Sequence, residues 1–212
     1  MAVSSAIAPP RRVVLATGNP GKLRELQQLL GAAFDLVPQT ELNISAIEET
    51  GQTFTENALL KARHASAQSG LPAIADDSGL EVDALGGAPG IRSARYAGID
   101  ASDKANNSKL LEALGTLAAA ERGAQFRCVI VYVRDADDPE PLISEGVWRG
   151  RILDAARGSG GFGYDPLFFD EAAELTGGEL DPEDKNRRSH RGMAVRQLGK
   201  LLESGDAKSD LD

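Results

Sequence analysis

The first part of the chain alternates apolar runs with stretches of helical periodicity. Val13–Ala16 is a short apolar run, which is typical of a buried strand. Leucines at positions 23, 26, 29 and 30 then recur with helical spacing. They predict a helix over Lys22–Leu30 that ends at Gly31. A strand, a polar turn and a helix in this order indicate the beginning of an α/β fold.

The same patterns predict further elements up to residue 119. Apolar positions on one face predict a helix over Thr53–Ser69, with Thr53 or Thr55 as its N-cap and Gly70 at its end. The other expected elements are a strand at Phe34–Pro38, a short strand at Leu71–Ala75 that leads into a turn at Asp76–Gly79, and a helix at Asp103–Ala119.

The second part of the chain begins with the strongest strand signal. Phe126–Arg134 is rich in β-branched and aromatic residues. An acidic loop and a second strand at Leu142–Gly150 complete a hairpin, and a C-terminal helix is expected over His190–Leu202. These elements predict a mixed sheet covered by helices, as one α/β domain over 12–202 with two lobes around a substrate cleft. We expect residues 1–11 to form a disordered extension and residues 203–212 a flexible tail.

The composition limits the class of protein. The 212 residues are 42% hydrophobic and 26% charged, as in an ordinary globular domain. The net charge of −9 disfavours a nonspecific nucleic-acid binder, which needs a basic surface. The single cysteine, Cys128, excludes an intramolecular disulfide framework and a multi-cysteine zinc site. No apolar run approaches the roughly 18 residues of a membrane span, and Met1–Pro10 lacks a signal-peptide pattern. We therefore expect a cytoplasmic protein that binds neither nucleic acid nor membrane.

The polar turn after the first strand is a candidate anion site. Backbone N–H groups and the positive end of a helix dipole attract anions at a helix start. The turn consists of Thr17, Gly18, Asn19, Pro20, Gly21 and Lys22. Its spacing differs from that of a Walker A motif. An ordinary strand-to-helix turn with a surface lysine is the alternative.

Two acidic pairs are candidates for metal binding. Asp76 and Asp77 follow an apolar strand, where carboxylates are unfavourable unless they are partnered. Mg²⁺ prefers carboxylates together with substrate phosphates and water. Glu48 and Glu49 form a second pair upstream. The alternatives are an Asp-rich turn that caps its own backbone and an exposed loop.

A glycine-rich loop and a basic stretch complete the candidate chemistry. Four glycines between Gly158 and Gly163 let the backbone approach a ligand closely, and Phe162 or Tyr164 offers a ring that can stack on a base. The basic stretch Lys185–Arg191 suits a polyphosphate or a carbonyl-rich base edge. The alternatives are a glycine turn with buried rings and a basic surface.

Taken together, these segments resemble the inosine/xanthosine triphosphate pyrophosphatase family. The matching motifs lie in order along Val13 to about Leu202. They are Leu15-Ala16-Thr17-Gly18-Asn19 through Lys22, Glu48-Glu49-Thr50-Gly51 with Thr53-Phe54 and Glu56-Asn57-Ala58, Ala75-Asp76-Asp77-Ser78-Gly79-Leu80, Gly87-Ala88-Pro89-Gly90 with Ser93-Ala94-Arg95-Tyr96, Gly160-Gly161-Phe162-Gly163-Tyr164-Asp165-Pro166, and Ser189-His190-Arg191.

The resemblance implies a Mg²⁺-dependent hydrolase that converts a purine nucleoside triphosphate to the monophosphate and pyrophosphate. The substrates it implies are ITP, dITP and XTP. Their removal from the nucleotide pool keeps these bases out of DNA and RNA. The resemblance also implies a long mixed central β-sheet flanked by helices, and a homodimer.

The functional residues of the family fall on matching positions of this chain. The resemblance implies that Asp77 is the proton acceptor and a metal ligand, and that Glu48 is the second acidic contact to the metal. It assigns the triphosphate to the turn Thr17–Lys22 with Lys61 and Ser78. The base and sugar fall to Phe162, Gly163, Tyr164, Asp165, Lys185, His190 and Arg191.

General chemistry is consistent with these assignments. Water attacks the α-phosphorus in line with the leaving pyrophosphate, and the charge that develops needs Mg²⁺ and lysines. The side chain of Arg191 only donates. It therefore favours the 6-oxo group of hypoxanthine and xanthine over the 6-amino group of adenine. Guanine shares the 6-oxo group, so we expect a backbone N–H near Phe162 to oppose its 2-amino group.

Two other functions fit the same residues. One is a pyrophosphatase for other modified nucleotides, which a comparison of substrates separates. The other is a nonhydrolytic nucleotide sensor, which needs the phosphate turn but neither Asp77 nor Mg²⁺. The presence of both acidic pairs favours catalysis.

Overall fold

A computed structural model describes residues 11–31 and 34–209 and contains a seven-stranded mixed sheet. The strand order is β2-β1-β3-β4-β5-β6-β7, parallel across β2-β1-β3 and antiparallel from β3 to β7. The strands are β1 (Arg11–Leu15), β2 (Phe34–Pro38), β3 (Ala73–Val82), β4 (Gly123–Val133), β5 (Leu142–Ile152), β6 (Phe168–Asp170) and β7 (Leu175–Thr176). The predicted α/β class with a mixed sheet is confirmed.

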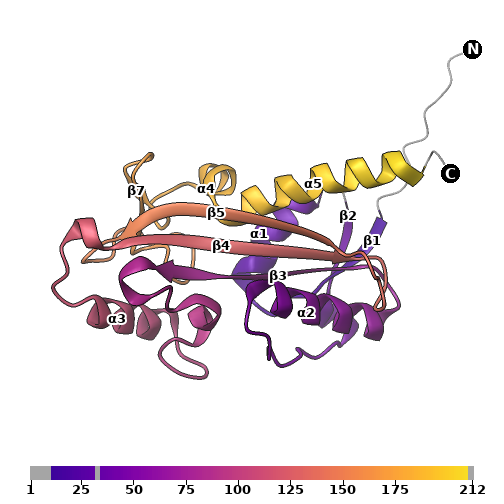
Figure 1. The fold of residues 1–212 in the computed structure, drawn as a ribbon, viewed down its shortest axis with the longest axis horizontal. Coiled ribbons are helices and arrows are strands. Elements are labelled where there is room, and N and C mark those ends of the chain that lie inside the picture. The colour runs from indigo at the N-terminus through magenta and orange to yellow at the C-terminus, as the bar shows by residue number, and fades with distance from the viewer. Residues whose placement is uncertain (1–10, 32–33, 210–212) are drawn as a thin grey trace, which may run out of the picture.

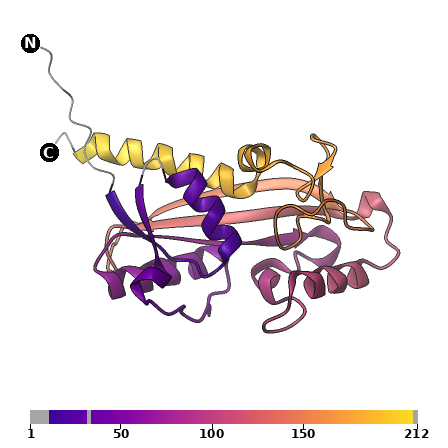
Figure 2. The same ribbon diagram turned by 180° about the vertical axis from the view of Figure 1, so that it is seen from behind.

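Helices cover both faces of this sheet. They are α1 (Pro20–Leu30), α2 (Phe54–Ser69), α3 (Asp103–Leu114), α4 (Pro182–Arg188) and α5 (His190–Ser209). Helices α2 and α3 lie on one side of the long strands β3, β4 and β5, and α5 lies on the other (Figure 1). The view from behind shows α1 beside β1 and β2 (Figure 2). None of the described helices is long and apolar enough to cross a membrane.

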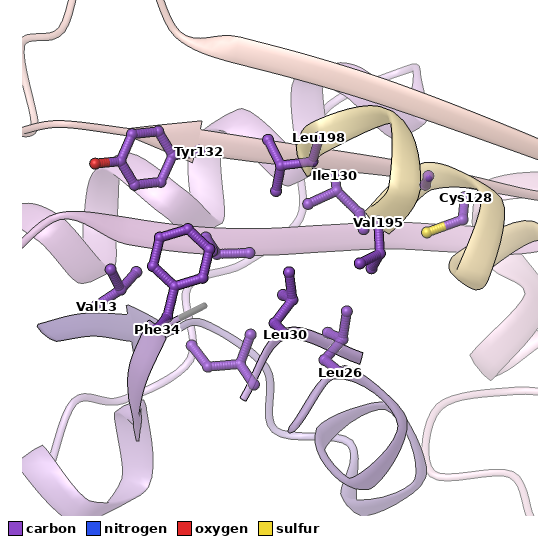
Figure 3. Close-up of a cluster of buried hydrophobic side chains, with 12 residues drawn as sticks. Val13, Leu26, Leu30, Phe34, Cys128, Ile130, Tyr132, Val195 and Leu198 are labelled. Atoms are coloured by element: carbon purple, nitrogen blue, oxygen red, sulfur yellow. The ribbon is translucent and has the colours of Figure 1, made fainter. Parts of the chain in front are cut away.

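Three hydrophobic clusters fill the two ends of the molecule. In the first, Leu26 of α1 and Leu198 of α5 pack against Ile130 of β4 (Figure 3). The second lies on the opposite face, where the alanines of α2 contact β1, β3 and β4. The third gathers Leu110 of α3 and Phe168 of β6 at the far end of the sheet. The long strands therefore connect two separately packed ends.

Helix α2 begins as its sequence predicts. Thr53 is the N-cap, and its side chain accepts a hydrogen bond from the N–H of Glu56. The Glu56 side chain in turn accepts from the N–H of Thr53, which completes a capping box. The helix ends at Gly70, whose φ of +68° favours glycine. The sequence thus sets both ends of the helix that faces the candidate site.

The predicted turn at Asp76–Gly79 is wrong. These residues continue strand β3, and each pairs with a residue of β4 between Ile130 and Arg127. Aspartate and glycine are poor strand formers, but the strongly β-forming strand β4 holds them in an extended conformation. The acidic pair therefore lies inside a strand and not in a loop.

Other boundaries differ from the predictions for local reasons. The helix expected over Asp103–Ala119 ends at Leu114, because Gly115 adopts a positive φ of 50°. Helix α4 was not predicted, although Asp181 as N-cap followed by Pro182 is a helix-start signal. Helix α5 continues to Ser209, seven residues beyond the predicted end at Leu202.

The two predicted terminal segments lie partly outside the described residues. Residues 1–10 of the expected extension lie outside the described residues, and Arg11 already belongs to β1. The predicted tail 203–212 is helical as far as Ser209, and residues 210–212 are not described.

Strand β1 is much shorter than β3, and this difference creates the site. Within the described chain, β1 pairs with β3 only at Val14–Ala73 and Leu15–Ile74. Between Ala75 and Gly79, the described part of strand β3 pairs with β4 alone, whereas farther along Glu81 also bridges Pro89. The segment Asp76–Gly79 therefore borders an open edge at the carboxyl ends of parallel strands, where α/β sheets bind ligands.

Candidate active site

Two adjoining cavities lie along this open edge. The first, here the strand-end cavity, has a volume of about 180 Å³ and is lined by Thr17, Glu49, Lys61 and Asp77 among others. The second, here the aromatic cavity, has a volume of about 260 Å³. Its lining includes Phe126, Phe162, Tyr164, Lys185 and Arg191. Asn19, Lys22, Ser78 and Ala94 line both, so the two cavities form one continuous cleft.

Strand geometry separates the two adjacent aspartates. Consecutive side chains of a strand point to opposite faces of the sheet. Ile74 belongs to the cluster formed with α1 and α5, whereas Ala73 and Ala75 belong to the cluster formed with α2. The same alternation directs Asp76 toward α1 and α5, and Asp77 toward α2.

Asp76 is enclosed by cations. Its Oδ2 lies 3.0 Å from Lys22 Nζ and 3.5 Å from Arg191 Nε, and it accepts a hydrogen bond of 2.9 Å from the Ser78 hydroxyl. Burial opposes ionisation, but the charges of Lys22, Arg191 and Lys61 outweigh it. They hold the pKa of Asp76 well below its usual value. Asp76 is therefore an anion at neutral pH, and its ion pairs join α1 and α5 to the sheet.

Asp77 has the opposite character. Asn57 Nδ2 donates to its Oδ2 over 3.2 Å, and Lys61 Nζ lies 3.4 Å from its Oδ1. Burial raises the pKa of Asp77 above its ordinary value, although Lys61 and Lys22 act against it; the negative charges of Glu49 and Asp76 also raise it. A carboxylate that binds a proton more readily than usual suits proton transfer.

The structure brings Glu49, and not Glu48, into the strand-end cavity. The Glu49 carboxylate lies 2.8 Å from Lys61 Nζ and 3.3 Å from Arg95 Nη1. Burial disfavours its charge, but Lys61 and Arg95 prevail and lower the pKa of Glu49. Glu48 is exposed and lines neither cavity.

The polar turn before α1 is shaped by its own cap. Asn19 is the N-cap of α1, and its Oδ1 accepts from the N–H groups of Gly21 and Lys22. Gly21 packs closely on Phe162, because a Cβ at this position would lie 2.6 Å from the ring. The turn therefore lies between the strand-end cavity and the Phe162 wall of the aromatic cavity.

A buried ion-pair cluster forms the floor of the aromatic cavity. Lys185 Nζ lies 2.6 Å from Glu25 and 2.7 Å from Asp165. Arg191 is paired with Glu25 and donates to Ser78 Oγ over 2.9 Å. Burial lowers the pKa of Lys185, but the charges of Asp165 and Glu25 raise it above its ordinary value. Both cations are therefore charged and held in place.

Only one of the two loop aromatics is available to a ligand. The Phe162 ring is partly exposed, with Lys185 Nζ 4.9 Å from its centroid. Tyr164 is buried in the third cluster, and its hydroxyl donates to the Ser93 carbonyl over 2.9 Å. Phe162 is therefore the ring that can stack on a base.

The expected backbone N–H for base readout is not free at the two positions nearest the ring. Phe162 N–H donates to Asp165 Oδ2 over 2.7 Å, and Gly163 N–H donates to Asp103 Oδ2 over 2.6 Å. The Gly163 carbonyl also accepts from Asn107 Nδ2. These hydrogen bonds hold the loop in its conformation. The N–H groups of Phe162 and Gly163 are therefore already used within the protein and are not available to a base.

His190 is a packed neutral imidazole at the edge of the aromatic cavity. Its ring stacks on Phe126 with centroids 4.8 Å apart, and burial moves its pKa well below the ordinary value, assisted by Arg191 and Lys185. Its Nδ1 is buried without a hydrogen-bond partner in the described chain. An unpartnered polar atom at a cavity wall can serve a ligand.

The structure therefore gathers most of the predicted site residues in one cleft. Those that line a cavity are Thr17, Gly18, Asn19, Lys22, Lys61, Asp77, Ser78, Phe162, Gly163, Tyr164, Asp165, Lys185, His190 and Arg191. Pro20, Gly21 and Glu48 line neither. Pro20 is the first residue of α1, where its missing N–H is tolerated.

The donor set fits a hard divalent cation. Asp77 and Glu49 line the strand-end cavity and present carboxylate oxygens to it. No group of three or more His, Cys, Asp or Glu ready to hold a metal occurs among residues 11–31 and 34–209. Mg²⁺ does not need such a cage, because it takes one or two carboxylates with substrate phosphates and water.

Comparison with known proteins identifies the family. The model of the Ham1 family matches residues 13–201. The chain belongs to the Ham1 family. The resemblance inferred from the ordered motifs is thereby confirmed.

Close relatives and a solved structure agree with this placement in the Ham1 family. A dITP/XTP pyrophosphatase of Methylococcus capsulatus is 60% identical over 193 residues, which is 91% of this chain and 96% of the relative. One of Thioalkalivibrio sulfidiphilus is 57% identical over 193 residues, 91% of this chain and 98% of the relative. The solved HAM1 protein from Coxiella burnetii has a TM-score of 0.84 at 50% identity, covering 92% and 99% of the two chains.

Sequence reasoning missed two polar residues of this Ham1-family site and chose the wrong member of one acidic pair for the cavity. Asn57 lies four residues before Lys61 and thus on the same helical face, which is a readable signal. Glu25 follows Lys22 by three residues on α1. Glu49 was named with Glu48 as an acidic pair, but Glu48 was chosen as the metal contact, and Glu49 lines the cavity. In each case the sequence shows a side chain of the right type, but only the fold selects it.

Proposed function

We propose that this chain hydrolyses non-standard purine nucleoside triphosphates, namely ITP, dITP and XTP, to the monophosphate and pyrophosphate. One observation carries the proposal. Asp77, with a raised pKa, lies in a cation-lined cavity that opens directly into a second cavity walled by Phe162. The dITP/XTP pyrophosphatase name of relatives that match most of the chain supports the same reaction.

The charged groups suggest how the triphosphate is held. Lys22 and Lys61 face the strand-end cavity, where they can neutralise phosphate oxygens. Lys61 and Arg95 are paired with Glu49 in this structure. An arriving polyphosphate offers these cations more negative charge than a single carboxylate, so we infer that it replaces Glu49 as their partner.

We propose Mg²⁺ as the cofactor, held by Asp77 and the acidic segment Glu48–Glu49. When bound, the ion neutralises charge on the phosphates and makes water easier to deprotonate. Asp77 accepts the proton of the attacking water. In the protein without a bound cation, burial raises the pKa of Asp77 above its ordinary value.

The aromatic cavity is proposed to select the base. Phe162 stacks on the purine, and Arg191 donates to its 6-oxo group, which adenine lacks. Glu25 and Ser78 hold the Arg191 guanidinium in a fixed orientation. Its N–H donors therefore point in a fixed direction, which favours a base with an acceptor at position 6. A homodimer, which the family resemblance implies, and a cytoplasmic location, which the sequence pattern favours, are part of this proposal.

Release of pyrophosphate tests the proposal. Equal concentrations of ITP, dITP, XTP, GTP and ATP are compared with and without Mg²⁺. We expect fast, Mg²⁺-dependent release from ITP, dITP and XTP and slow release from GTP and ATP. Equal rates on all five contradict the selectivity. Binding of ITP without release supports the sensor, and preferential hydrolysis of modified pyrimidine nucleotides supports the other pyrophosphatase.

The two glutamates of the acidic segment provide a matched pair of variants. Glu48→Gln and Glu49→Gln remove the same charge from adjacent positions. The variant of the residue that contacts the metal raises the Mg²⁺ concentration for half-maximal activity by about tenfold. The other variant changes it little. Equal effects of both variants contradict a specific ligand in this segment.

A further inference from the structure

Asn57 occupies a junction between the acidic segment and Asp77. It is completely buried in helix α2. Its Oδ1 accepts from the Gly51 N–H over 2.8 Å, and its Nδ2 donates to Asp77 Oδ2 over 3.2 Å. Gly51 directly follows the segment Glu48–Thr50. One amide group therefore joins the loop that carries the glutamates to the strand that carries Asp77.

A second connection runs parallel to the first. Lys61, one helical turn after Asn57, contacts Glu49 at 2.8 Å and Asp77 Oδ1 at 3.4 Å. The two oxygens of Asp77 thus have different partners from one helix face. The Lys61 connection is ionic, and the Asn57 connection is a pair of neutral-donor hydrogen bonds.

The two connections respond differently to ligands. A phosphate competes with the carboxylates of Glu49 and Asp77 for Lys61, because it is also negative. A divalent cation competes with Lys61 for these carboxylates, because it is also positive. Neither competes well with a buried carboxamide whose donor and acceptor are both used. When Lys61 turns to the substrate, only Asn57 continues to hold the loop and Asp77 together.

We propose that Asn57 is the positioning residue that keeps the acidic segment Glu48–Glu49, through Gly51, and the Asp77 carboxylate in a fixed relative position during turnover. This inference rests on the proposed function, since it assigns Asn57 to the same reaction. Asn57 is fully buried and lines neither cavity. It acts by fixing the direction of Asp77 Oδ2, while Asp77 Oδ1 accepts from the Ser78 N–H over 3.0 Å and contacts Lys61.

Close packing supports a fixed junction. A Cβ on Gly51 would lie 2.6 Å from Asn57 Oδ1 and 2.7 Å from Glu56 Cβ. Gly51 therefore allows the loop to approach the amide closely. This contact offers a variant, Gly51→Ala, that displaces the loop without removing the amide from Asp77.

Three variants separate the parts of the proposal. Asn57→Leu removes both hydrogen bonds at similar volume, and Gly51→Ala disturbs only the loop side. Ser66→Ala is the control, because Ser66 is a buried residue of the same helix that lines neither cavity and bonds the Leu71 carbonyl. The readouts are kcat and KM for ITP, melting temperature, and Mn²⁺ binding to the substrate-free protein by the EPR signal of free Mn²⁺.

We expect Asn57→Leu to lower kcat roughly 100-fold, the typical result of a small misplacement, with KM within about twofold. Gly51→Ala has a smaller effect on kcat. Both weaken Mn²⁺ binding, and Ser66→Ala changes only the melting temperature. An unchanged kcat in folded Asn57→Leu, or a loss that appears in KM alone, overturns the proposal.

The controls distinguish failure of this inference from failure of the proposed function. If the wild-type protein releases pyrophosphate and binds Mn²⁺ but the variants match it, only the inference fails. If the wild type neither releases pyrophosphate nor binds Mn²⁺, the proposed function fails, and the inference fails with it. If Asn57→Leu does not fold, normal kcat and Mn²⁺ binding in Gly51→Ala overturn the inference.

Discussion

Asp76 and Asp77 are adjacent in the sequence and opposite in their physical behaviour. Asp76 faces α1 and α5, where Lys22 and Arg191 lower its pKa. Asp77 faces α2, where burial raises its pKa and an amide and one lysine are its partners. The difference shows that residue type does not decide the role of a carboxylate. The face of the strand decides it, because each face meets different helices.

The comparison assigns structure to one aspartate and chemistry to the other. Asp76 has its charge satisfied and anchors two helices. Asp77 keeps an oxygen toward a cavity and binds protons more readily than usual. Residues whose pKa is strongly perturbed are typical of functional sites. Asp77, whose charged form is disfavoured by burial, is therefore the candidate for catalysis.

The largest expected effect is a loss of turnover when Asp77 is replaced, because Asp77 and not Asp76 is assigned to the chemistry. Asp77→Asn keeps the size of the side chain and removes the proton acceptor. We expect pyrophosphate release from ITP to fall about 10²–10⁴-fold, with the fold intact because Lys61 keeps Glu49. Steady-state kinetics and thermal melting measure both. A near wild-type rate with unchanged melting contradicts the role given to Asp77.

The next effect is on stability and belongs to the other face. Asp76→Asn leaves Lys22 and Arg191 without their shared buried carboxylate. Removing one partner of a buried ion pair costs about 3–5 kcal/mol, and we expect the lower end because Lys22 is partly exposed. Urea unfolding at pH 7 measures the loss. A variant as stable as the wild type shows that Asp76 is not the anchor.

The pH dependence gives the two aspartates opposite signs. The pKa of Asp76 is lowered in the folded state, so its contribution is present above the ordinary value of 3.8 and is lost as pH falls through the folded pKa. The pKa of Asp77 is raised in the folded state. Its contribution to the free energy of unfolding is therefore fully present below the ordinary value of 3.8 and is lost as pH rises through the folded pKa.

Urea unfolding from pH 3 to 7 without divalent cations tests these signs. The stability deficit of Asp76→Asn shrinks toward low pH. Asp77→Asn gains stability over the wild type as pH rises, because it no longer has to ionise a buried carboxyl. The same trend in both variants contradicts the comparison.

The smallest effect concerns the helix that faces Asp77. Thr53→Ala removes the N-cap of α2, whose loss costs about 1 kcal/mol. Asn57 and Lys61 lie farther along the helix, so kcat on ITP stays unchanged. Thermal melting and kinetics together test this. A large fall in kcat shows instead that the helix start itself orients Asp77.

The sequence predicted the fold class and most of the candidate site, for local reasons. The periodicity of Lys22–Leu30 and the capping residues of α2 specify their helices without help from the rest of the chain. The strand at Phe126–Arg134 was equally clear. The prediction for Asp76–Gly79 was wrong because a neighbour overrides local preference: β4 holds these residues in a strand.

By itself, the sequence determined the elements with strong local patterns, the acidic charge of the chain, the family motifs and the residue types of the site. Only the tertiary structure decided that Asp76 and Asp77 serve different faces, that Glu49 lines the cavity in place of Glu48, and that Asn57 joins the loop to Asp77. The physical reason is that these assignments depend on side-chain direction and on contacts between distant segments. A linear pattern contains neither until the sheet and its helices are packed together.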